Sequence, residues 1–153
     1  MMRGIITDET EIYVYFELIK RMQPGSVLDV GMFLTRIGAL SRQAMNCGIP
    51  KEVELTGVKL FDGMDFPVHR KVYDRMLTLS SLEDKTYDLA ALFSVNEYLD
   101  EEQKLAFWEY LSGHCKCMLA DTRDALFVQY VVERFRCEAV TVDDRQYAVV
   151  YCG

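Results

Sequence analysis

The hydrophobic positions of the chain fall into short segments whose spacing alternates between that of helices and that of strands. Over residues 9–22, Ile12, Phe16 and Ile19 recur at helical intervals, which indicates a helix with one buried face. The next segment, Ser26 to Val30, is a short and nearly continuous apolar run. Such a run is typical of a strand that is covered on both faces of its sheet.

The same alternation continues to the end of the chain. Helices are predicted over residues 35–46, 67–77, 100–111 and 124–135, and further strands over 53–58, 76–79, 89–93, 116–121, 137–142 and 146–152. The SGH tripeptide, Ser112 to His114, is expected to end the third of these helices. The last two strands are joined by only DDR, so they must pair antiparallel. Strands that alternate with helices predict an α/β fold, in which a mostly parallel sheet lies between two helical layers.

Composition narrows the class of protein further. The chain has 153 residues, of which half are hydrophobic, and its formal net charge is −7. One domain over residues 1–153 with a substantial core is therefore expected, and the acidic balance argues against nucleic acid or an anionic membrane surface as a partner. Five cysteines at irregular spacing, with no apolar leader before them, predict reduced thiols in a cytoplasmic protein.

Three motifs in the expected order resemble those of class I S-adenosylmethionine-dependent methyltransferases. They are VLDVG at residues 27–31, YDLAALFSVNEYL at 87–99 and LSGHCKCMLAD at 111–121. The resemblance covers nearly the whole chain. It implies a Rossmann-like transferase fold with a seven-stranded sheet in the order 3-2-1-4-5-7-6, the last strand antiparallel, and S-adenosylmethionine as cofactor.

The resemblance also implies roles for the residues that follow the first strand. Where the family carries DVGCGTG, this chain keeps the first glycine, Gly31, and has Phe33 and Thr35 at the other two glycine positions. Phe33 either fills the space of the methionine moiety or points away and walls the pocket. Asp29 either hydrogen-bonds near the cofactor's amino group or caps the turn that starts the second helix.

Two further signatures of the family depart from its usual pattern. The acid that binds the ribose is replaced by Lys59, whose ammonium group has no acceptor; Asp62 could serve in its place or be an ordinary loop residue. Ser80 or Ser81 lies where the family has a polar residue that binds the adenine amine. Ser94 is expected beside the cofactor at the mouth of the fourth strand, where the family also places substrate contacts, here Asn96, Glu97 and Tyr98.

Other chemistries are less compatible with the sequence. HCKC, residues 114–117, supplies three of the four ligands that a closed zinc site needs, so buried thiols are predicted and no metal. His69 is expected on a solvated helix face. The dinucleotide fingerprint GxGxxG would need glycines at Gly31, Phe33 and Arg36, and only the first is present.

Two functions follow from these observations. In the first, the protein binds S-adenosylmethionine and transfers its methyl group to a small molecule, with catalytic residues that the sequence does not identify. In the second, it is a non-catalytic relative that keeps the methyltransferase fold and acts as a binding or assembly module, as a homodimer or with a partner protein. The altered residues around Gly31 are the reason to keep the second alternative.

Overall fold

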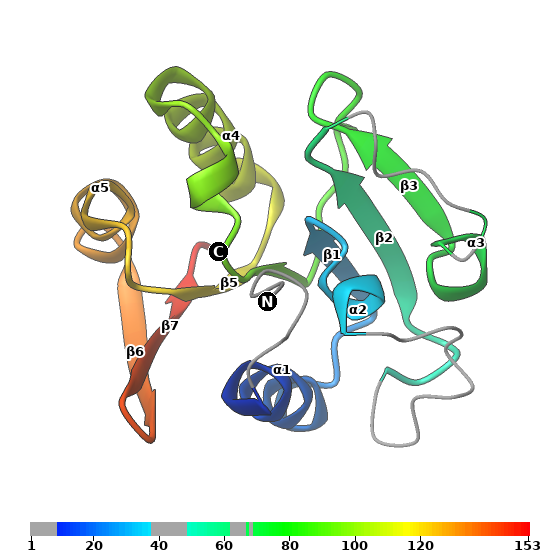
Figure 1. Ribbon diagram of the computed structural model, residues 1–153, viewed down its shortest axis with the longest axis horizontal. Helices are drawn as coiled ribbons and strands as arrows, with labels where there is room; N and C mark the ends of the chain where they lie inside the picture. The colour runs from blue at the N-terminus through cyan, green and yellow to red at the C-terminus, as the bar shows by residue number, and fades with distance from the viewer. Residues whose placement is uncertain (1–8, 38–48, 62–66, 68) are drawn as a thin grey trace, which may run out of the picture.

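A seven-stranded sheet forms the centre of the molecule. The computed structural model describes residues 9–37, 49–61, 67 and 69–153. Within them the strands are β1 (Ser26–Val30), β2 (Glu54–Lys59), β3 (Arg75–Thr78), β4 (Leu89–Leu92), β5 (Cys117–Asp121), β6 (Arg136–Val142) and β7 (Arg145–Tyr151). Their spatial order is β3-β2-β1-β4-β5-β7-β6 (Figure 1). β7 is antiparallel to both of its neighbours and the other pairs are parallel, so the predicted topology is confirmed.

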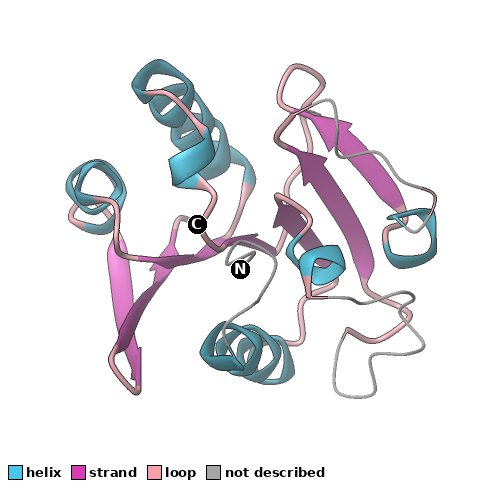
Figure 2. Cartoon of the chain, viewed as in Figure 1, coloured by secondary structure: helices cyan, strands magenta, loops and turns pink. Residues whose placement is uncertain are grey.

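Helices cover both faces of this sheet (Figure 2). They are α1 (Glu9–Met22), α2 (Phe33–Arg36), α3 (His69–Val72), the 3-10 turn η2 (Asn96–Tyr98), α4 (Glu101–His114), α5 (Ala125–Phe127) and the π-helical turn η3 (Val128–Val132). Side chains of α1, α2 and α3 share one hydrophobic core with the sheet, and those of α4, α5 and η3 share the other. Among the described residues, no helix has the length and apolarity needed to cross a membrane.

Alternate residues of each strand supply the two cores. On β1, Val27 belongs to the core under α1, whereas Leu28 and Val30 belong to the core under α4. On the α4 side, Trp108 is buried, and its indole N–H donates to the Asn96 side chain at 3.0 Å. With Phe107 and Leu111, Trp108 forms the buried face of α4. At the start of α4, Asp100 forms the capping box with Gln103 that the sequence indicates.

Several helix boundaries differ from those predicted, and two of the differences have a clear cause. SGH does not end α4, because its side chains bond within the helix: Ser112 Oγ donates to the Trp108 carbonyl at 2.7 Å, and the His114 ring bonds the Tyr110 carbonyl. α3 ends at Val72 instead of residue 77. There Asp74 pairs with β2 by backbone and side chain, which directs the chain into β3. The rest of the predicted 35–46 helix lies outside the described residues.

The helical position of Gly113 gives a direct stability prediction. A Cβ built there meets no atom within 4 Å, and alanine is about 1 kcal/mol more favourable than glycine inside a helix. Gly113→Ala should therefore raise the free energy of unfolding by about 0.5–1 kcal/mol in urea titrations followed by Trp108 fluorescence. A loss of stability would contradict the helical position of Gly113 and would favour the predicted end of the helix at SGH.

Candidate functional site

The turn after β1 is the structural centre of the candidate site. β1 lies between β2 and β4, so its carboxyl end opens at the middle of the sheet. Gly31 has φ +80° and Met32 has φ +52°. Glycine adopts such a left-handed backbone without strain, whereas methionine does so at a cost. The retained first glycine of the motif therefore stands at a position whose backbone conformation favours glycine.

Asp29 holds this turn in place. Its carboxylate accepts hydrogen bonds from the backbone N–H groups of Phe33 and Leu34, at 3.1 and 3.2 Å, and from the Tyr73 hydroxyl at 2.6 Å. Asp29 is fully buried. Burial raises its pKa to about 6, although the three hydrogen bonds act in the opposite direction. Of the two predicted roles, the carboxylate performs the capping role.

Backbone donors of the turn are used within the protein. Gly31 N–H donates to the Val58 carbonyl at 2.8 Å and Met32 N–H to the Asp29 carbonyl at 3.3 Å. The next two amides are held by the Asp29 side chain, and those of Thr35 and Arg36 donate to the Met32 carbonyl. From Gly31 to Arg36, every amide therefore has a partner before any ligand binds. A ligand at this turn would therefore be held mainly by van der Waals contacts and by side-chain groups, and not by the backbone amides.

Apolar side chains cover the turn closely. A Cβ placed on Gly31 would lie 3.2 Å from Leu60 Cδ1 and 3.5 Å from Val95 Cγ2. On the neighbouring strand, a Cβ on Gly57 would lie 2.9 Å from Met32 Cγ. Leu60 follows β2 and Val95 follows β4. The loops after the two flanking strands therefore each place one side chain over the glycine. The protein itself occupies the space directly against Gly31.

Phe33 lies in the interior of the protein, and Thr35 is half-buried. The Phe33 ring is 1% exposed and packs with Tyr15 and Phe93, at centroid distances of 5.6 and 4.9 Å. A ring this enclosed does not line an open cavity, so it fills space on the α1 side of the turn. The Thr35 hydroxyl donates to the Met32 carbonyl at 2.7 Å and closes the first turn of α2.

The ends of β2 and β3 carry the other predicted cofactor residues. Lys59 is the last residue of β2, as the alignment with the family placed it, and Asp62 lies outside the described residues. Ser80 is exposed, and its hydroxyl bonds to that of Thr78 at 3.1 Å. Ser81 also bonds Thr78 and closes the same turn. Binding of a cofactor by Asp62 or Ser80 stays a prediction.

Ser94 lies in a polar cluster that the sequence did not reveal in full. It has φ +55°, and its N–H donates to the Asp121 carboxylate at 2.8 Å. Arg123 donates to the same carboxylate at 3.3 Å and also to the Ser94 hydroxyl. Asp121 and Arg123 were missed as site residues. The signal that could have found them is the acid at the end of the apolar run CMLAD, since β5 adjoins β4.

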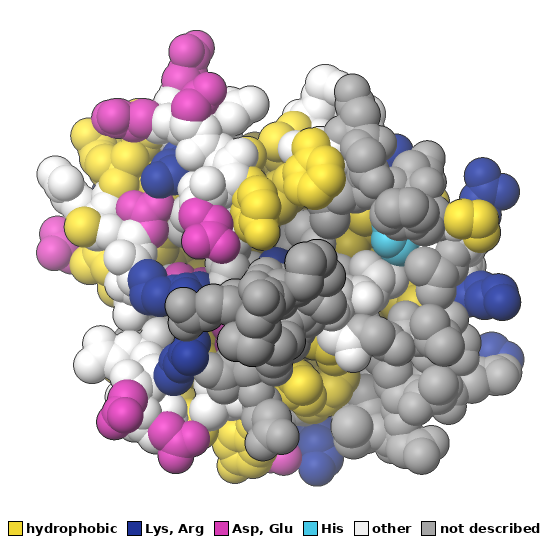
Figure 3. Space-filling model, viewed as in Figure 1, with side chains coloured by type: hydrophobic (Ala, Val, Ile, Leu, Met, Phe, Trp, Pro, Cys, Tyr) yellow, Lys and Arg dark blue, Asp and Glu magenta, His cyan; other side chains and the backbone are white. Residues whose placement is uncertain are grey.

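Two aromatic rings are exposed beside the turn. Phe61, after β2, is 54% exposed, and Tyr98, in η2, is 46% exposed; their centroids are 6.3 Å apart. Figure 3 shows hydrophobic side chains at the surface between the end of β2 and helix α4. The two rings thus lie near each other on the two loops that carry Leu60 and Val95. Exposed rings of this kind offer a planar ligand a stacking surface.

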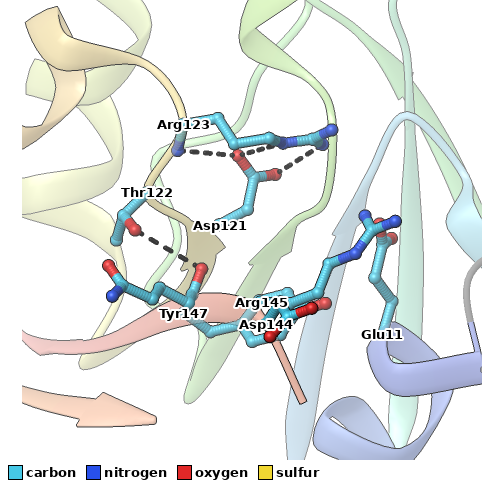
Figure 4. Close-up of a pocket in the computed structure, with 8 residues that line it drawn as sticks. Glu11, Asp121, Thr122, Arg123, Asp144, Arg145 and Tyr147 are labelled. Atoms are coloured by element: carbon cyan, nitrogen blue, oxygen red, sulfur yellow. Dashed lines mark hydrogen bonds and ion pairs between the residues drawn. The ribbon is translucent and has the colours of Figure 1, made fainter. Parts of the chain in front are cut away.

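Two cavities open near the carboxyl ends of β4 and β5. One of them also borders the turn between β6 and β7. The first, about 310 Å³, is lined by Glu11, Asp121, Arg123, Asp144, Arg145 and Tyr147, among others (Figure 4). The second, about 280 Å³, is lined by Ser94, Glu97, Lys104, Asp121, Arg123 and Asp124, among others. Asp121 and Arg123 line both cavities, and the second also includes Asn96 and Glu97, two of the predicted substrate contacts. We call the two cavities together the β4–β5 groove.

The described residues contain no group of three or more His, Cys, Asp or Glu side chains placed to hold a metal ion. Cys115 and Cys117 are buried, and burial raises the pKa of both thiols well above the usual value. His114 bonds Asp84 instead of facing the thiols. His69 is buried against Tyr73, so its predicted solvated position is wrong.

The buried Asp29 predicts a specific pH dependence of stability. Its pKa in the folded protein, about 6, exceeds the ordinary value of 3.8, so folding favours the protonated form. Stability from this group is therefore lost as pH rises from about 4 to above 6, by about 3 kcal/mol. The unfolding free energy of the wild type minus that of Asp29→Asn, measured in urea, should fall by about 2 kcal/mol of this total between pH 4.5 and 7.5. A difference that is flat or that rises with pH would contradict it.

The two tyrosines near Asp29 should respond oppositely to loss of their hydroxyls. Tyr73 donates to the carboxylate, whereas the Tyr15 hydroxyl is buried and has no hydrogen-bond partner within the described residues. Tyr73→Phe should cost about 1–3 kcal/mol of unfolding free energy, and Tyr15→Phe should leave stability unchanged or improve it by about 1 kcal/mol. Equal losses in urea titrations of both variants would refute this assignment of the hydrogen bond.

Comparison with known proteins gives matches at the level of structure only. No protein-family model and no curated protein matches the sequence. The methyltransferase domain of a bacterial Hen1 superposes with a TM-score of 0.62 at 16% identity, over 93% of this chain and 97% of that one. A putative caffeoyl-CoA O-methyltransferase from Staphylococcus aureus gives 0.64 at 12%, over 95% and 85%.

A third structure, magnesium protoporphyrin IX methyltransferase from Synechocystis with bound S-adenosylmethionine, gives a TM-score of 0.61 at 16% identity, over 94% of this chain and 78% of that one. At identities this low, the likeness establishes the fold and not the activity. The sheet order, the antiparallel β7 and these superpositions agree. The protein has the fold of the class I S-adenosylmethionine-dependent methyltransferases.

Proposed function

We propose that the protein binds S-adenosylmethionine at the turn after β1 and presents it to a small molecule in the β4–β5 groove. The observation that carries this proposal is the left-handed Gly31, held by Asp29 at the centre of a methyltransferase sheet. In open α/β sheets, ligands bind outside the carboxyl ends of the strands. Two cavities of the described residues lie at the carboxyl ends of the neighbouring strands β4 and β5.

The residues at this edge fit the adenosyl group in part. Gly31 supplies the turn, and the exposed rings of Phe61 and Tyr98 supply apolar surface for a planar base. Lys59 cannot accept hydrogen bonds from ribose hydroxyls. Binding therefore depends more on packing than on polar recognition, and Leu60 and Val95 must move away from Gly31. When bound, the cofactor would supply an electrophilic methyl group on a sulfonium.

A second function, binding or assembly without catalysis, is favoured by the same covering of Gly31. Leu60 Cδ1 already occupies van der Waals space against the glycine, and the amides of the turn have partners within the protein. In this alternative the turn keeps its shape because Asp29 and its neighbours form part of the core. The two functions differ in one measurable quantity, the affinity for the cofactor.

Calorimetric titration with S-adenosylhomocysteine tests the proposal. We expect one saturable site, and stabilisation by roughly 2.7 kcal/mol when the ligand is at about 100 times its dissociation constant. Leu60→Ala should bind about three- to tenfold more tightly, because the truncated side chain leaves Gly31 open. Leu105→Ala, a truncation of a partly buried leucine on α4, is the matched control and should leave the affinity unchanged.

Two results of this titration would count against the proposal. Absence of heat and of thermal stabilisation at millimolar ligand, in the wild type and in Leu60→Ala, would favour the non-catalytic function. Binding that is equally strengthened by Leu60→Ala and by Leu105→Ala would show that loosening of the core, and not the opening of Gly31, controls the affinity.

A further inference from the structure

β6 forms an open edge of the central sheet. It is the last strand in the sheet order, so within the described residues only its β7 side is paired (Figure 1). All residues of Arg136–Val142 pair one to one with β7, so no bulge bends the edge away, and the strand contains no proline. Bulges and prolines are among the usual devices by which proteins protect such an edge. β6 therefore has the geometry to accept a further strand.

Two hydrogen bonds of β7 and its end show which residues of β6 face outward. The Gln146 carbonyl accepts from Thr122 N–H at 3.3 Å, so the backbone groups of Gln146 point toward β5. Cys152 N–H donates to the Lys116 carbonyl at 2.9 Å and points the same way. Backbone groups of successive residues in a strand point to opposite sides. The odd-numbered residues from Arg145 to Tyr151 therefore direct their backbone groups to β6.

The partners of those residues are the even-numbered residues of β6, from Arg136 to Val142. These form the hydrogen-bonded pairs of the antiparallel ladder. The three residues between them point their N–H and C=O groups away from β7; they are Cys137, Ala139 and Thr141. Within the described part of the chain, these six backbone groups have no hydrogen-bond partner. An added strand would provide one for each of them.

The charges along β6 and its flanking residues show which strand fits. Arg134 and Arg136 lie at its start, and Asp143 and Asp144 form the turn at its end. All four residues are exposed. The one charge in the middle of the strand, Glu138, already forms an ion pair of 2.8 Å with an arginine of α1. An antiparallel strand of the same sequence would place its acidic end against this basic start, and its basic start against this acidic end.

We propose that β6 pairs antiparallel with β6 of a second copy of this chain, about a two-fold axis at Ala139. This register aligns Ala139 with its equivalent, and Cys137 with Thr141 of the second copy. It also sets Arg134 opposite Asp144 of the second copy, twice by symmetry, and opposite charges across a strand pair are stabilising. One surface serves both copies, as a two-fold interface requires. The pairing is independent of the proposed function.

Neighbouring registers satisfy fewer groups. With the axis at Glu138, the two Glu138 side chains would lie directly opposite each other, and like charges so placed are destabilising. With the axis at Val140, Cys137 would lie opposite the turn residue Asp143 and lose its strand partner. The register about Ala139 is thus the one that pairs all the outward-facing groups.

A groove beside this edge adds apolar surface. It has a volume of about 460 Å³ and lies between α1 and the β6–β7 hairpin, with charged residues of α1 in the rest of its lining. Its apolar lining is Tyr13, Val14, Leu18, Val140 and Val149. Because opposed residues of paired strands point to the same face of the sheet, the second copy would bring its own groove to this face.

Sedimentation equilibrium of the wild-type protein tests the proposal. We expect a reversible monomer–dimer equilibrium at micromolar concentrations that weakens at raised salt. Ala139→Pro removes an outward N–H and leaves the β6–β7 ladder intact, and proline is tolerated at such positions of an edge strand. By symmetry it removes two hydrogen bonds of the dimer, so it should weaken the dimer by about tenfold or more. Its urea unfolding should remain cooperative.

Charge exchange gives a test that does not depend on proline. Asp144→Arg and Arg134→Asp should each weaken the homodimer by about tenfold, because like charges then meet at both ends of the strand pair. An equimolar mixture of the two variants should form a heterodimer about as tight as the wild-type dimer, since opposite charges meet again. The control is Glu109→Arg, on the exposed surface of α4, which changes the net charge as Asp144→Arg does and should leave the dimer unaffected.

Hydrogen exchange locates the contact. The amides of Cys137, Ala139 and Thr141 should be protected only where the dimer forms, whereas those of Glu138 and Val140 should be protected at all concentrations by β7. A wild-type protein that stays monomeric would overturn the proposal, as would a dimer that persists unchanged in Ala139→Pro and Asp144→Arg. Failure of the mixed charge variants to associate would overturn the register.

Discussion

The hydrogen bonds of one buried carboxylate set the geometry of the candidate site. Asp29 accepts hydrogen bonds from two backbone amides and from the Tyr73 hydroxyl, and its side chain is fully buried. Because a buried carboxylate is costly unless it is hydrogen-bonded, the segment that provides those donors is fixed as well. The turn of Gly31 is therefore formed by the protein alone. Its shape resembles that of the family's cofactor turn, but its backbone amides donate to groups within the protein.

This constraint explains how the fold and the cofactor residues can diverge. The fold depends on many apolar positions, such as Val27 and Leu28 on opposite faces of β1, and changes at a few polar positions leave it intact. The family's cofactor signature depends on few residues, and this chain departs from it at Phe33, Thr35 and Lys59. Leu60 and Val95 then pack where a ligand would otherwise touch Gly31. In contrast, the β4–β5 groove remains open and charged.

Much of the fold could be predicted from the sequence, because strand burial and helix spacing are local patterns. β1, β5 and the β6–β7 hairpin follow directly from apolar runs and from a connection too short for a crossover. The errors arose where side chains contact distant residues. Asp74 ends α3 through its bonds to β2, and Asp121, at the end of β5, accepts from Ser94, which follows β4. No local pattern encodes the contact of Leu60 with Gly31.

The most direct test of this account is a crystal structure of the protein grown with S-adenosylhomocysteine. The account predicts an ordered adenosyl group beside Gly31, Leu60 and Val95 displaced from the glycine, and the bonds from Phe33, Leu34 and Tyr73 to Asp29 unchanged. A ligand bound with Asp29 turned away from the amides to reach it would contradict the claim that the core, and not the cofactor, fixes the turn.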